Sequence, residues 1–452
     1  MPGSIPVSPQ RPPVVLLGGG PIAVPVARSL AGAGVFVYAL GFSLDPVRAS
    51  RACGKFVDLG AGEGVADRWV DWLDGRNAAG AIVFPCNDDG LEVVANHRSS
   101  LTERGYLFIP TNDDVVRAML DKLRTYELAQ AAGVRTPRHV VMGPDDDLGA
   151  LGAEFDFPLA LKPRHGHVFA RHFGLRHKAF VVHDQAELEA AQDQVRRFQL
   201  DVLVTEIVPG PEDTYHSYYT YIDPDGIPLF DFSKRKLRQF SPGFGLGTAH
   251  LVDRDERTIE LGRQLLTGMG LRGLACVEFK TDVRDGDLTL IECNPRFTAG
   301  HELVRHAGID LGLLAYNRVV GLPDPPLDHY RTGLRMWHPI EDLRGFVAYR
   351  RRGELTFGRW LRTVLHRQHF PIFSWQDPLP TLFSLSRFIL PRSVLRRLIA
   401  NREATELDVA RTSAPAVELV EVATDQTSAA TTASATSEVL PAADSARSRR
   451  KS

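Results

Sequence analysis

Cysteine is scarce in this 452-residue sequence, and long hydrophobic runs are absent. The four cysteines, Cys53, Cys86, Cys276 and Cys293, show no metal-binding spacing, and so few in so long a chain do not predict a disulfide framework. We therefore expect four free thiols. Because no apolar run approaches the roughly 18 residues that a membrane-spanning helix needs, stable insertion into a membrane is not expected.

An excess of charge of either sign is also missing, because 53 basic and 55 acidic residues leave a formal net charge of -2. This balance gives no reason to expect nucleic acid as a partner. The stretch before Val14 is proline-rich and lacks the basic head and apolar core of a secretory signal. With 44% hydrophobic residues, the chain fits a globular, cytoplasmic enzyme that acts on small molecules.

The first part of the sequence alternates strands and helices in the manner of a parallel α/β fold. We therefore predict a small, doubly wound, Rossmann-like domain over residues 1–110. Its strands are predicted at 14–17, 35–40, 81–85 and 106–110, and its helices at 21–33 and 90–104.

A second domain is predicted over residues 111–322. Thr111 or Asn112 can cap a helix that closes at Gly133, because apolar residues from Val115 to Leu123 recur at helical spacing. Beyond residue 140, strand pairs are mixed with helices, which is typical of an α+β domain with antiparallel sheets. The predicted strands are 159–162, 202–206, 215–222, 274–280 and 288–293.

The last part of the sequence divides into an extension and a tail. Residues 323–411 form a C-terminal extension without a predicted fold of its own, but with helices at 355–367 and 393–402. Residues 412–452 are rich in Ala, Thr and Ser, and this composition predicts a disordered tail. The arginines of the extension either cover solvated helix faces, which is the interpretation we favour, or contact a membrane surface or partner. These arginines are residues 350–352, 392, 396, 397 and 402.

The strongest chemical signal is a predicted hairpin that carries Glu278 on one strand and Glu292 on the next, with a turn at Asp285-Gly286. Asn294 lies two residues beyond Glu292 and faces the same way. Three oxygen ligands would then converge, and Mg2+, or Mn2+ in its place, prefers such ligands together with substrate phosphates. Arg296 follows as a candidate phosphate clamp.

For either glutamate alone, an exposed hairpin that faces water is the simpler interpretation. The apolar neighbours of Glu292, which are Leu290 and Ile291, favour the metal site. An ionised carboxylate among such side chains is costly unless it has a cation or hydrogen-bond donors.

A basic strand over residues 232–238 leads into a glycine-rich loop at 241–248. Lys236, Arg238 and the N–H groups of the loop can lie beside a transferring phosphoryl group and stabilise its charge. The alternative is a solvated, basic edge strand, and the residues alone leave both interpretations open.

Four blocks, in order along the chain, resemble the ATP-grasp superfamily. The resemblance is to its carboxylate-amine ligase branch, which includes D-aspartate ligase-like proteins and is similar to the carbamoyl phosphate synthetase type. It covers residues 14–321. The blocks are Asp121-Lys122-Leu123 with the turn 132–137, the strand 157–163 around Lys162, the segment 205–210, and the hairpin with Glu278, Glu292 and Asn294.

The resemblance implies a role for residues of each block. Lys162 and Lys122 would neutralise the α- and β-phosphates of ATP. Glu206 would accept a hydrogen bond from adenine, and the backbone of Ile207 and Val208 would recognise the rest of its edge. Either Glu212 or Asp213 would hold the ribose hydroxyls, unless the pair is an ordinary turn sequence.

The resemblance also implies the fold and the reaction. A Rossmann-like pre-ATP-grasp domain would precede a two-lobed ATP-grasp domain. With ATP and Mg2+, the enzyme would convert a carboxylate to an acylphosphate and transfer the acyl group to an amine or similar nucleophile; we also consider a homodimer. The alternatives are a phosphotransferase, an ATP-binding protein without catalysis, and an NAD-dependent oxidoreductase.

Two segments bear on these alternatives. The segment 18–23, Gly-Gly-Gly-Pro-Ile-Ala, matches a dinucleotide fingerprint with alanine as its last residue. However, the strand 35–40 ends without the expected acid, and Asp45 comes only after a further loop. The segment 164–172 is rich in Arg and His where ATP-grasp proteins have a more glycine-rich flap, and we interpret its three histidines, His165, His167 and His172, as part of a surface loop rather than a metal cluster.

Overall fold

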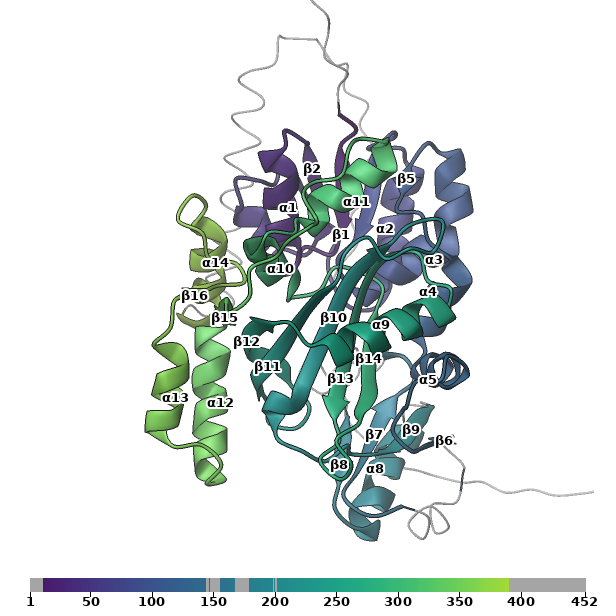
Figure 1. Ribbon diagram of the computed structural model, residues 1–452. Helices are drawn as coiled ribbons and strands as arrows, with labels where there is room; N and C mark the ends of the chain where they lie inside the picture. The colour runs from purple at the N-terminus through teal and green to yellow at the C-terminus, as the bar shows by residue number, and fades with distance from the viewer. Residues whose placement is uncertain are drawn as a thin grey trace, which may run out of the picture. The chain divides into compact units, whose positions relative to one another are not determined.

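The first sheet of the protein is parallel, as the alternation of strands and helices predicts. A computed structural model describes residues 11–143, 146, 155–166, 179–197, 199 and 201–389. Five strands lie in the order β3-β2-β1-β4-β5 (Figure 1). They are β1 Val14–Leu17, β2 Val37–Gly41, β3 Lys55–Asp58, β4 Ile82–Pro85 and β5 Leu107–Phe108.

Helices cover both faces of this sheet, which explains why the central strand β1 is wholly buried. Val14 and Leu16 join one hydrophobic cluster, and Val15 and Leu17 join another on the opposite face. The sequence pattern does not predict strand β3 or helix α2. The helical elements are α1 Ala23–Gly32, the short η1 Pro46–Ala49, α2 Val65–Asp74 and α3 Asp88–Glu103.

The second sheet has seven strands in the order β14-β13-β10-β11-β12-β15-β16, and all neighbours except β15 and β16 run antiparallel. This sheet confirms the antiparallel arrangement predicted beyond residue 140. Helix α9, Glu256–Gly268, packs against it. The strands are β10 Tyr215–Ile222, β11 Phe232–Phe240, β12 Leu246–Asp253, β13 Gly273–Thr281, β14 Leu288–Asn294, β15 Arg335–Trp337 and β16 Gln368–His369.

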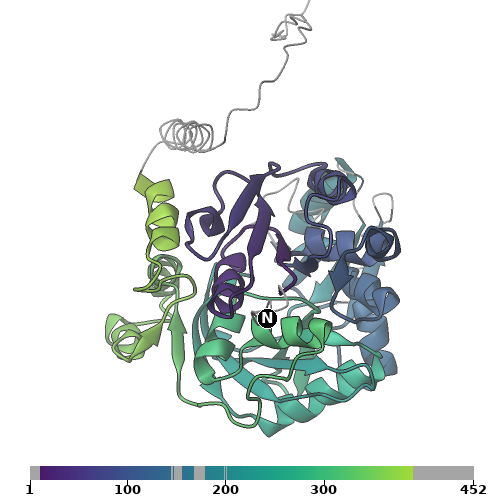
Figure 2. The ribbon, with the colours of Figure 1, turned by 90° about the horizontal axis from the view of Figure 1, so that it is seen from above.

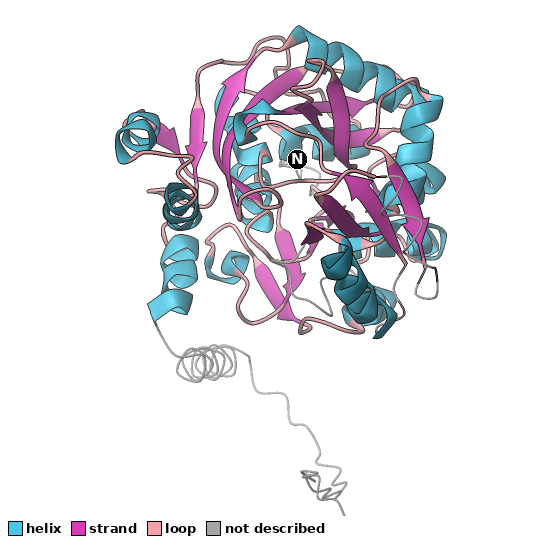
Figure 3. Cartoon of the chain, turned by 90° about the horizontal axis from the view of Figure 1, so that it is seen from below, coloured by secondary structure: helices cyan, strands magenta, loops and turns pink. Residues whose placement is uncertain are grey.

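The third sheet is a small antiparallel one in the order β6-β9-β7-β8, and helix α8, Gln185–Arg197, packs against it. Figure 3 shows the strands of the protein with the helices around them. Parallel and antiparallel sheets in one chain agree with the predicted combination of α/β and α+β structure. The strands are β6 His139–Met142, β7 Leu159–Pro163, β8 Phe180–Val182 and β9 Val202–Glu206.

The single helix predicted between Asn112 and Gly133 is wrong, because the structure has two helices there, α4 Asp113–Leu120 and α5 Lys122–Ala131. Asn112 does cap α4, since its Oδ1 accepts hydrogen bonds from two N–H groups of the first turn. Asp121 breaks the helical run in an extended conformation and caps α5. Its carboxylate pairs with Arg164, a contact that local periodicity does not reveal.

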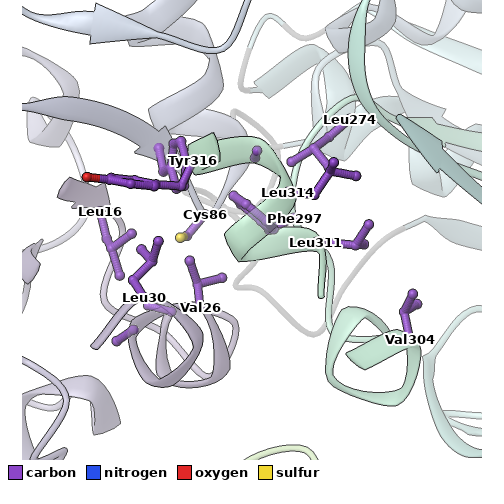
Figure 4. Close-up of a cluster of buried hydrophobic side chains, with 14 of the residues drawn as sticks. Leu16, Val26, Leu30, Cys86, Leu274, Phe297, Val304, Leu311, Leu314 and Tyr316 are labelled. Carbon is purple, nitrogen blue, oxygen red and sulfur yellow. The ribbon is translucent and has the colours of Figure 1, made fainter. Parts of the chain in front are cut away.

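A hydrophobic core joins the parallel sheet to helices α10, His301–Ala307, and α11, Leu311–Val320. Leu16, Leu314 and Tyr316 belong to this core (Figure 4). The hydroxyl of Tyr316 donates to the carbonyl of Pro12, 304 residues earlier in the chain. Helix α11 contacts α1 and lies beside the parallel sheet (Figure 2), so segments that are far apart in the sequence share one core.

The C-terminal extension continues the central sheet, since β15 pairs with β12 and β16 pairs with β15. Its helices are α12 Pro339–Arg351, α13 Phe357–Val364 and α14 Leu379–Ile389. Helix α13 falls inside the predicted range 355–367, whereas the pattern does not predict α12 or α14. The helix expected at 393–402 and the tail expected at 412–452 lie outside the described residues. Within the described chain, no helix is long and apolar enough to cross a membrane.

Candidate active site

A cavity of about 740 Å³ is lined by residues of all three sheets. The parallel sheet contributes the loops that follow β1, β2, β3 and β4, at the carboxyl ends of these strands, where open α/β sheets bind their ligands. The volume lies in the range of small-molecule sites. Nine of the twelve predicted site residues line this one cavity: Lys122, Lys162, Glu206, Ile207, Val208, Lys236, Glu278, Glu292 and Arg296.

Two of the predicted phosphate ligands, Lys162 and Lys122, come from neighbouring elements. Lys162 lies on strand β7 and is 8% exposed, and its Nζ is 3.5 Å from the hydroxyl of Tyr126. Burial lowers the pKa of Lys162 to about 8, and the nearby charge of Glu292 partly opposes this shift. Lys122 opens helix α5, and its N–H donates to the carbonyl of Arg164 just after β7, which ties the two elements together.

The segment after strand β9 carries the predicted adenine contacts, Glu206, Ile207 and Val208. Glu206 already accepts two hydrogen bonds, at 2.9 Å from the N–H of Arg138 and at 3.1 Å from Arg284. The carbonyl of Val208 accepts from Lys280 at 2.8 Å. These contacts fix the course of the segment along the cavity.

Asp213, the predicted ribose ligand, is not among the described residues that line the cavity. It lies in the short helix η2, Glu212–Thr214. Its neighbour Glu212 accepts a hydrogen bond of 2.8 Å from the N–H of Gly243, which does line the cavity. Neither acid is among the described residues lining the cavity, so the ribose contact stays a prediction for both.

The metal-ligand candidates are arranged as the hairpin predicts. Glu278 and Glu292 are direct cross-strand partners on β13 and β14, and Gly286 in the connecting turn has a positive φ of 81°. Asn294 lies two residues further along β14 and lines a smaller hollow that shares Glu292 and Lys122 with the main cavity. In all, two carboxylates and one amide are brought together.

This donor set fits a hard divalent cation. The described residues hold no group of three or more His, Cys, Asp or Glu side chains suited to a metal, so the protein alone offers only part of a coordination sphere. Mg2+ is commonly held in this way, by one or two carboxylates with substrate phosphates completing the shell. At present, Oε1 of Glu278 accepts from Nζ of Lys236 at 2.9 Å, and Oδ1 of Asn294 accepts from Arg296 at 2.9 Å.

Arg296 is the cation that links the hairpin to the parallel sheet. Its Nε lies 2.5 Å from a carboxylate oxygen of Asp88, at the start of helix α3. Although burial opposes it, the charge of Asp88 raises the pKa of Arg296 above its usual value. The guanidinium is therefore charged and oriented at the cavity wall, as a phosphate or carboxylate clamp requires.

Arg238 is placed differently from the prediction. It is 6% exposed and does not line the cavity, because its guanidinium forms two hydrogen bonds of 2.8 Å with Asp342 of helix α12. A direct contact with phosphate is therefore not favoured by its position. Lys236, two residues earlier on β11, does line the cavity.

Several cavity residues carry no sequence signal of their own. Gln239 lines the cavity, and its Oε1 accepts from Lys236 at 3.2 Å. Trp69 also lines it, and its buried indole nitrogen has no hydrogen-bond partner among the described residues. Asp88 belongs to the acidic segment that follows β4. Asn87 caps α3 there by accepting from the N–H of Gly90, and Asp88 also reaches Arg296.

The glycine loop after β1 faces an acid rather than an open phosphate site. Asp45 is 5% exposed and accepts a hydrogen bond of 3.0 Å from the N–H of Phe42. It packs so closely on the loop that a Cβ added at Gly19 would lie 2.7 Å from its carboxylate. A dinucleotide pyrophosphate at this loop would therefore meet a negative charge, which disfavours the oxidoreductase alternative.

The chain is similar in sequence to two kinds of ligase. Over 219 residues, 46% of the chain, it is 31% identical to a D-alanine--D-alanine ligase of Stutzerimonas stutzeri, with 66% of that protein covered. Over 252 residues, 54% of the chain, it is 23% identical to a D-aspartate ligase of Enterococcus faecium, with 59% of that protein covered. The chain thus matches somewhat less than two thirds of the length of these relatives.

A solved structure shares the fold. The biotin carboxylase domain of the Hydrogenobacter thermophilus 2-oxoglutarate carboxylase, solved with MgADP and bicarbonate, superposes with a TM-score of 0.56 at 19% identity. The superposition covers 71% of this chain and 73% of that domain. No protein-family model matches the chain.

Proposed function

Because the chain belongs to the ATP-grasp superfamily, we propose that it is a ligase that uses ATP to activate a substrate carboxylate and transfers the acyl group to an amine or similar nucleophile. One observation carries this proposal. The buried cation of Lys162, the Lys236–Glu278 ion pair and Glu292 line a single cavity. That cavity runs from the segment after β9 to the carboxyl ends of the parallel strands, so it can hold a nucleotide and a second substrate together.

The two parts of the cavity would bind different molecules. Ile207 and Val208 would meet the adenine edge, and Lys162 and Lys122 would neutralise the phosphates. The loops of the parallel sheet would hold the carboxylate substrate, which is the role of a pre-ATP-grasp domain. Phe42, Asp45 and Trp69 line this end.

Glu278, Glu292 and Asn294 would hold Mg2+, or Mn2+ in its place. When bound, the ion would supply positive charge to the β- and γ-phosphates. Lys236 and Arg296 would then stabilise the charge that develops as the substrate carboxylate attacks the γ-phosphorus. The acylphosphate formed in this way would be attacked by an amine, with release of phosphate.

The chain would act in the cytoplasm, where ATP is abundant and the four cysteines remain free thiols. Its partners would be small-molecule carboxylates and amines rather than nucleic acid. A homodimer is compatible with the proposal but is not needed, since the described residues of one chain already line the cavity.

The decisive experiment measures ADP release from the full chain against pooled carboxylates and amino compounds, with Mg2+ present. We expect release that depends on a carboxylate, and an amide product that depends on an amine. Release without any amine, together with a stable phosphorylated product, would instead identify a phosphotransferase. ATP binding without release would identify a non-catalytic protein.

Glu292→Gln tests the metal site within the same assay. This variant should lose ADP formation while keeping the circular dichroism spectrum and melting temperature of the native protein. Glu260→Gln is the matched control, because Glu260 is exposed on helix α9 and outside the cavity. Full turnover by Glu292→Gln would refute the assignment.

A further inference from the structure

Helices α12 and α13 form a pair with two very different sides. On the inner side, Phe346 of α12 stacks on Trp360 of α13 at 4.9 Å between ring centroids, and Asp342 is fully buried against the central sheet. The two helices lie next to each other in Figure 1. The exposed residues of this pair, which we call the α12–α13 face, are Leu343, Val347, Phe357, Leu365 and the exposed arginines of residues 344–367.

The α12–α13 face exposes large apolar side chains. Leu343 and Val347, one turn apart on α12, are 52% and 40% exposed, and Phe357 and Leu365 are 52% and 74% exposed. Helix α13 has no fully buried residue: its Trp360 packs on Phe346, whereas Arg359 and Arg362 lie on the exposed side of the helix. Large apolar side chains that stay half exposed on two neighbouring helices indicate a surface that meets an apolar environment.

The same segment is strongly basic. Between residues 343 and 376 the sequence has seven arginines, at 344, 350, 351, 352, 359, 362 and 367, and only one acidic residue, Glu354. All seven are exposed. Within the described chain, no ion pair involves any of the arginines from Arg350 to Arg367. This local excess contrasts with the near-neutral balance of the whole protein.

Exposed apolar residues continue beyond α13. Trp375, which packs edge-on against Phe373, is 88% exposed. Leu379, Leu382 and Leu385 on helix α14 are 44%, 56% and 36% exposed and recur every three residues, so they share one side of the helix. Surfaces that lie at the boundary between lipid headgroups and acyl chains are rich in tryptophan and leucine beside arginine.

We propose that the α12–α13 face, with Trp375 and the leucines of α14, docks the protein on the surface of an anionic lipid membrane. The arginines would pair with anionic headgroups, and the apolar side chains would enter the headgroup layer without spanning the bilayer. A second copy of this chain would bring arginine against arginine. Nucleic acid offers no apolar layer for Leu365 and the leucines of α14. The charge and the exposed apolar area together therefore favour lipid.

Docking of this kind does not involve the cavity. None of Leu343, Phe357, Leu365, Trp375 or Arg351 lines it. The proposed ligase reaction in solution should consequently be insensitive to changes in this face, and the two proposals can fail separately.

The test is sedimentation of the full chain with phosphatidylcholine vesicles and with vesicles containing 30% phosphatidylserine. We expect binding to the anionic vesicles alone, and release at 0.5 M NaCl because salt screens the headgroup charges. Equal binding to both vesicle types, or no binding to either at low salt, would overturn the proposal.

Variants assign the binding to this face. Arg351→Gln/Arg359→Gln should weaken the vesicle partition constant by about 30-fold, because each arginine near the surface contributes about 1 kcal/mol. The matched control, Arg254→Gln/Arg257→Gln, removes two exposed arginines near the start of α9 and should bind like the native chain. Leu365→Ser/Trp375→Ser should also weaken binding, which a purely electrostatic contact would not show.

Two results would contradict this assignment. If both arginine variants bind equally to anionic vesicles, the contact lies elsewhere in the chain. If the native chain dimerises without lipid, and Leu365→Ser/Trp375→Ser is monomeric, then the face belongs to an interface between two copies. In each case light scattering and circular dichroism of the same samples verify that the variants are folded, whether or not the protein releases ADP.

Discussion

The Nζ of Lys236 lies 2.9 Å from Oε1 of Glu278, so the predicted catalytic lysine and a predicted metal ligand form one ion pair in the cavity. The lysine is 4% exposed, and it also donates to Gln239. In the proposed reaction, a divalent cation held by Glu278 would compete with Lys236 for that carboxylate. Lys236 would then be free to approach the phosphate whose charge we propose it stabilises.

The first prediction concerns this competition. Lys236→Met should lower kcat by about 10²- to 10³-fold, because one preorganised cation is removed from the transferring phosphoryl group. The Mg2+ concentration that gives half-maximal rate should fall, since Glu278 loses its competing partner. ADP release measured across a Mg2+ titration checks both effects. Lys55→Met, an exposed lysine on β3, is the control and should change neither. A higher Mg2+ requirement in Lys236→Met would contradict the competition.

A second prediction follows from the lowered pKa of Lys162, which burial brings from 10.5 to about 8. Below pH 8 the side chain is an ammonium and attracts phosphate, and above pH 8 it becomes neutral. The Kd for ADP should therefore rise by about tenfold per pH unit above pH 8. The rise should end at the higher pKa that Lys162 has when phosphate is bound. Calorimetric titration between pH 6.5 and 9.5 measures this.

Lys162→Arg is the control for that experiment, because a guanidinium keeps its charge throughout this range. Its Kd should be nearly constant with pH. The same shift affects folding: the unfolded chain binds more protons between pH 8 and 10.5, so this residue makes stability rise with pH across that window. A Kd of the native protein that is flat to pH 9.5 would show that Lys162 does not contact phosphate.

The sequence predicts those features of the site that arise from neighbouring residues. The hairpin of Glu278 and Glu292 is such a case, because strand periodicity and the Asp285-Gly286 turn set its register. Strands β9 and β10 are found at their predicted bounds for a similar reason: each is rich in β-branched or aromatic residues.

The features that sequence does not predict depend on distant partners. Asp121 breaks a helix that its own neighbours would continue, and it pairs with Arg164, 43 residues later. The carboxylate that takes Arg238 away from the cavity, Asp342, is 104 residues further along the chain. Neither ion pair produces a periodic pattern in the sequence. Only the three-dimensional structure shows that Arg238 pairs with Asp342.

The third prediction concerns Asp342, which joins the C-terminal extension to the central sheet. Its buried carboxylate accepts from Arg238, Thr248 and the indole nitrogens of Trp337 and Trp360. Asp342→Asn should lower the free energy of unfolding by about 3–5 kcal/mol, because the charge of Arg238 remains buried without a counter-charge. Urea denaturation measures the change.

Asp328→Asn is the matched control, since Asp328 is exposed and forms no ion pair within the described residues. It should shift the free energy of unfolding by less than about 0.5 kcal/mol. An equally small change for Asp342→Asn would mean that water or neighbouring groups compensate Arg238. Replacing both Arg238 and Asp342 by apolar residues should recover part of the loss, which separates the cost of the unpaired charge from that of the lost contacts.

The fourth prediction concerns the substrate end of the cavity, where Gly19 and Gly20 are adjacent but have different surroundings. A methyl group at Gly19 would lie 2.7 Å from the carboxylate of Asp45 and 2.9 Å from its Cβ, whereas one at Gly20 would meet nothing within 4 Å. Asp45 is buried and held by the N–H of Phe42, so it cannot swing aside without disturbing that loop.

Gly19→Ala should therefore lower kcat/KM for the carboxylate substrate by up to about 100-fold, since small displacements of a positioning loop have effects of this size. The Kd for ADP should not change, because Gly19 follows β1 of the parallel sheet, whereas Lys162, the proposed phosphate ligand, lies on β7 of the small sheet. Gly20→Ala should behave like the native enzyme in both measurements. If Gly19→Ala weakens ADP instead and leaves the carboxylate unaffected, the nucleotide lies at the glycine loop, and the two ends of the cavity must be exchanged.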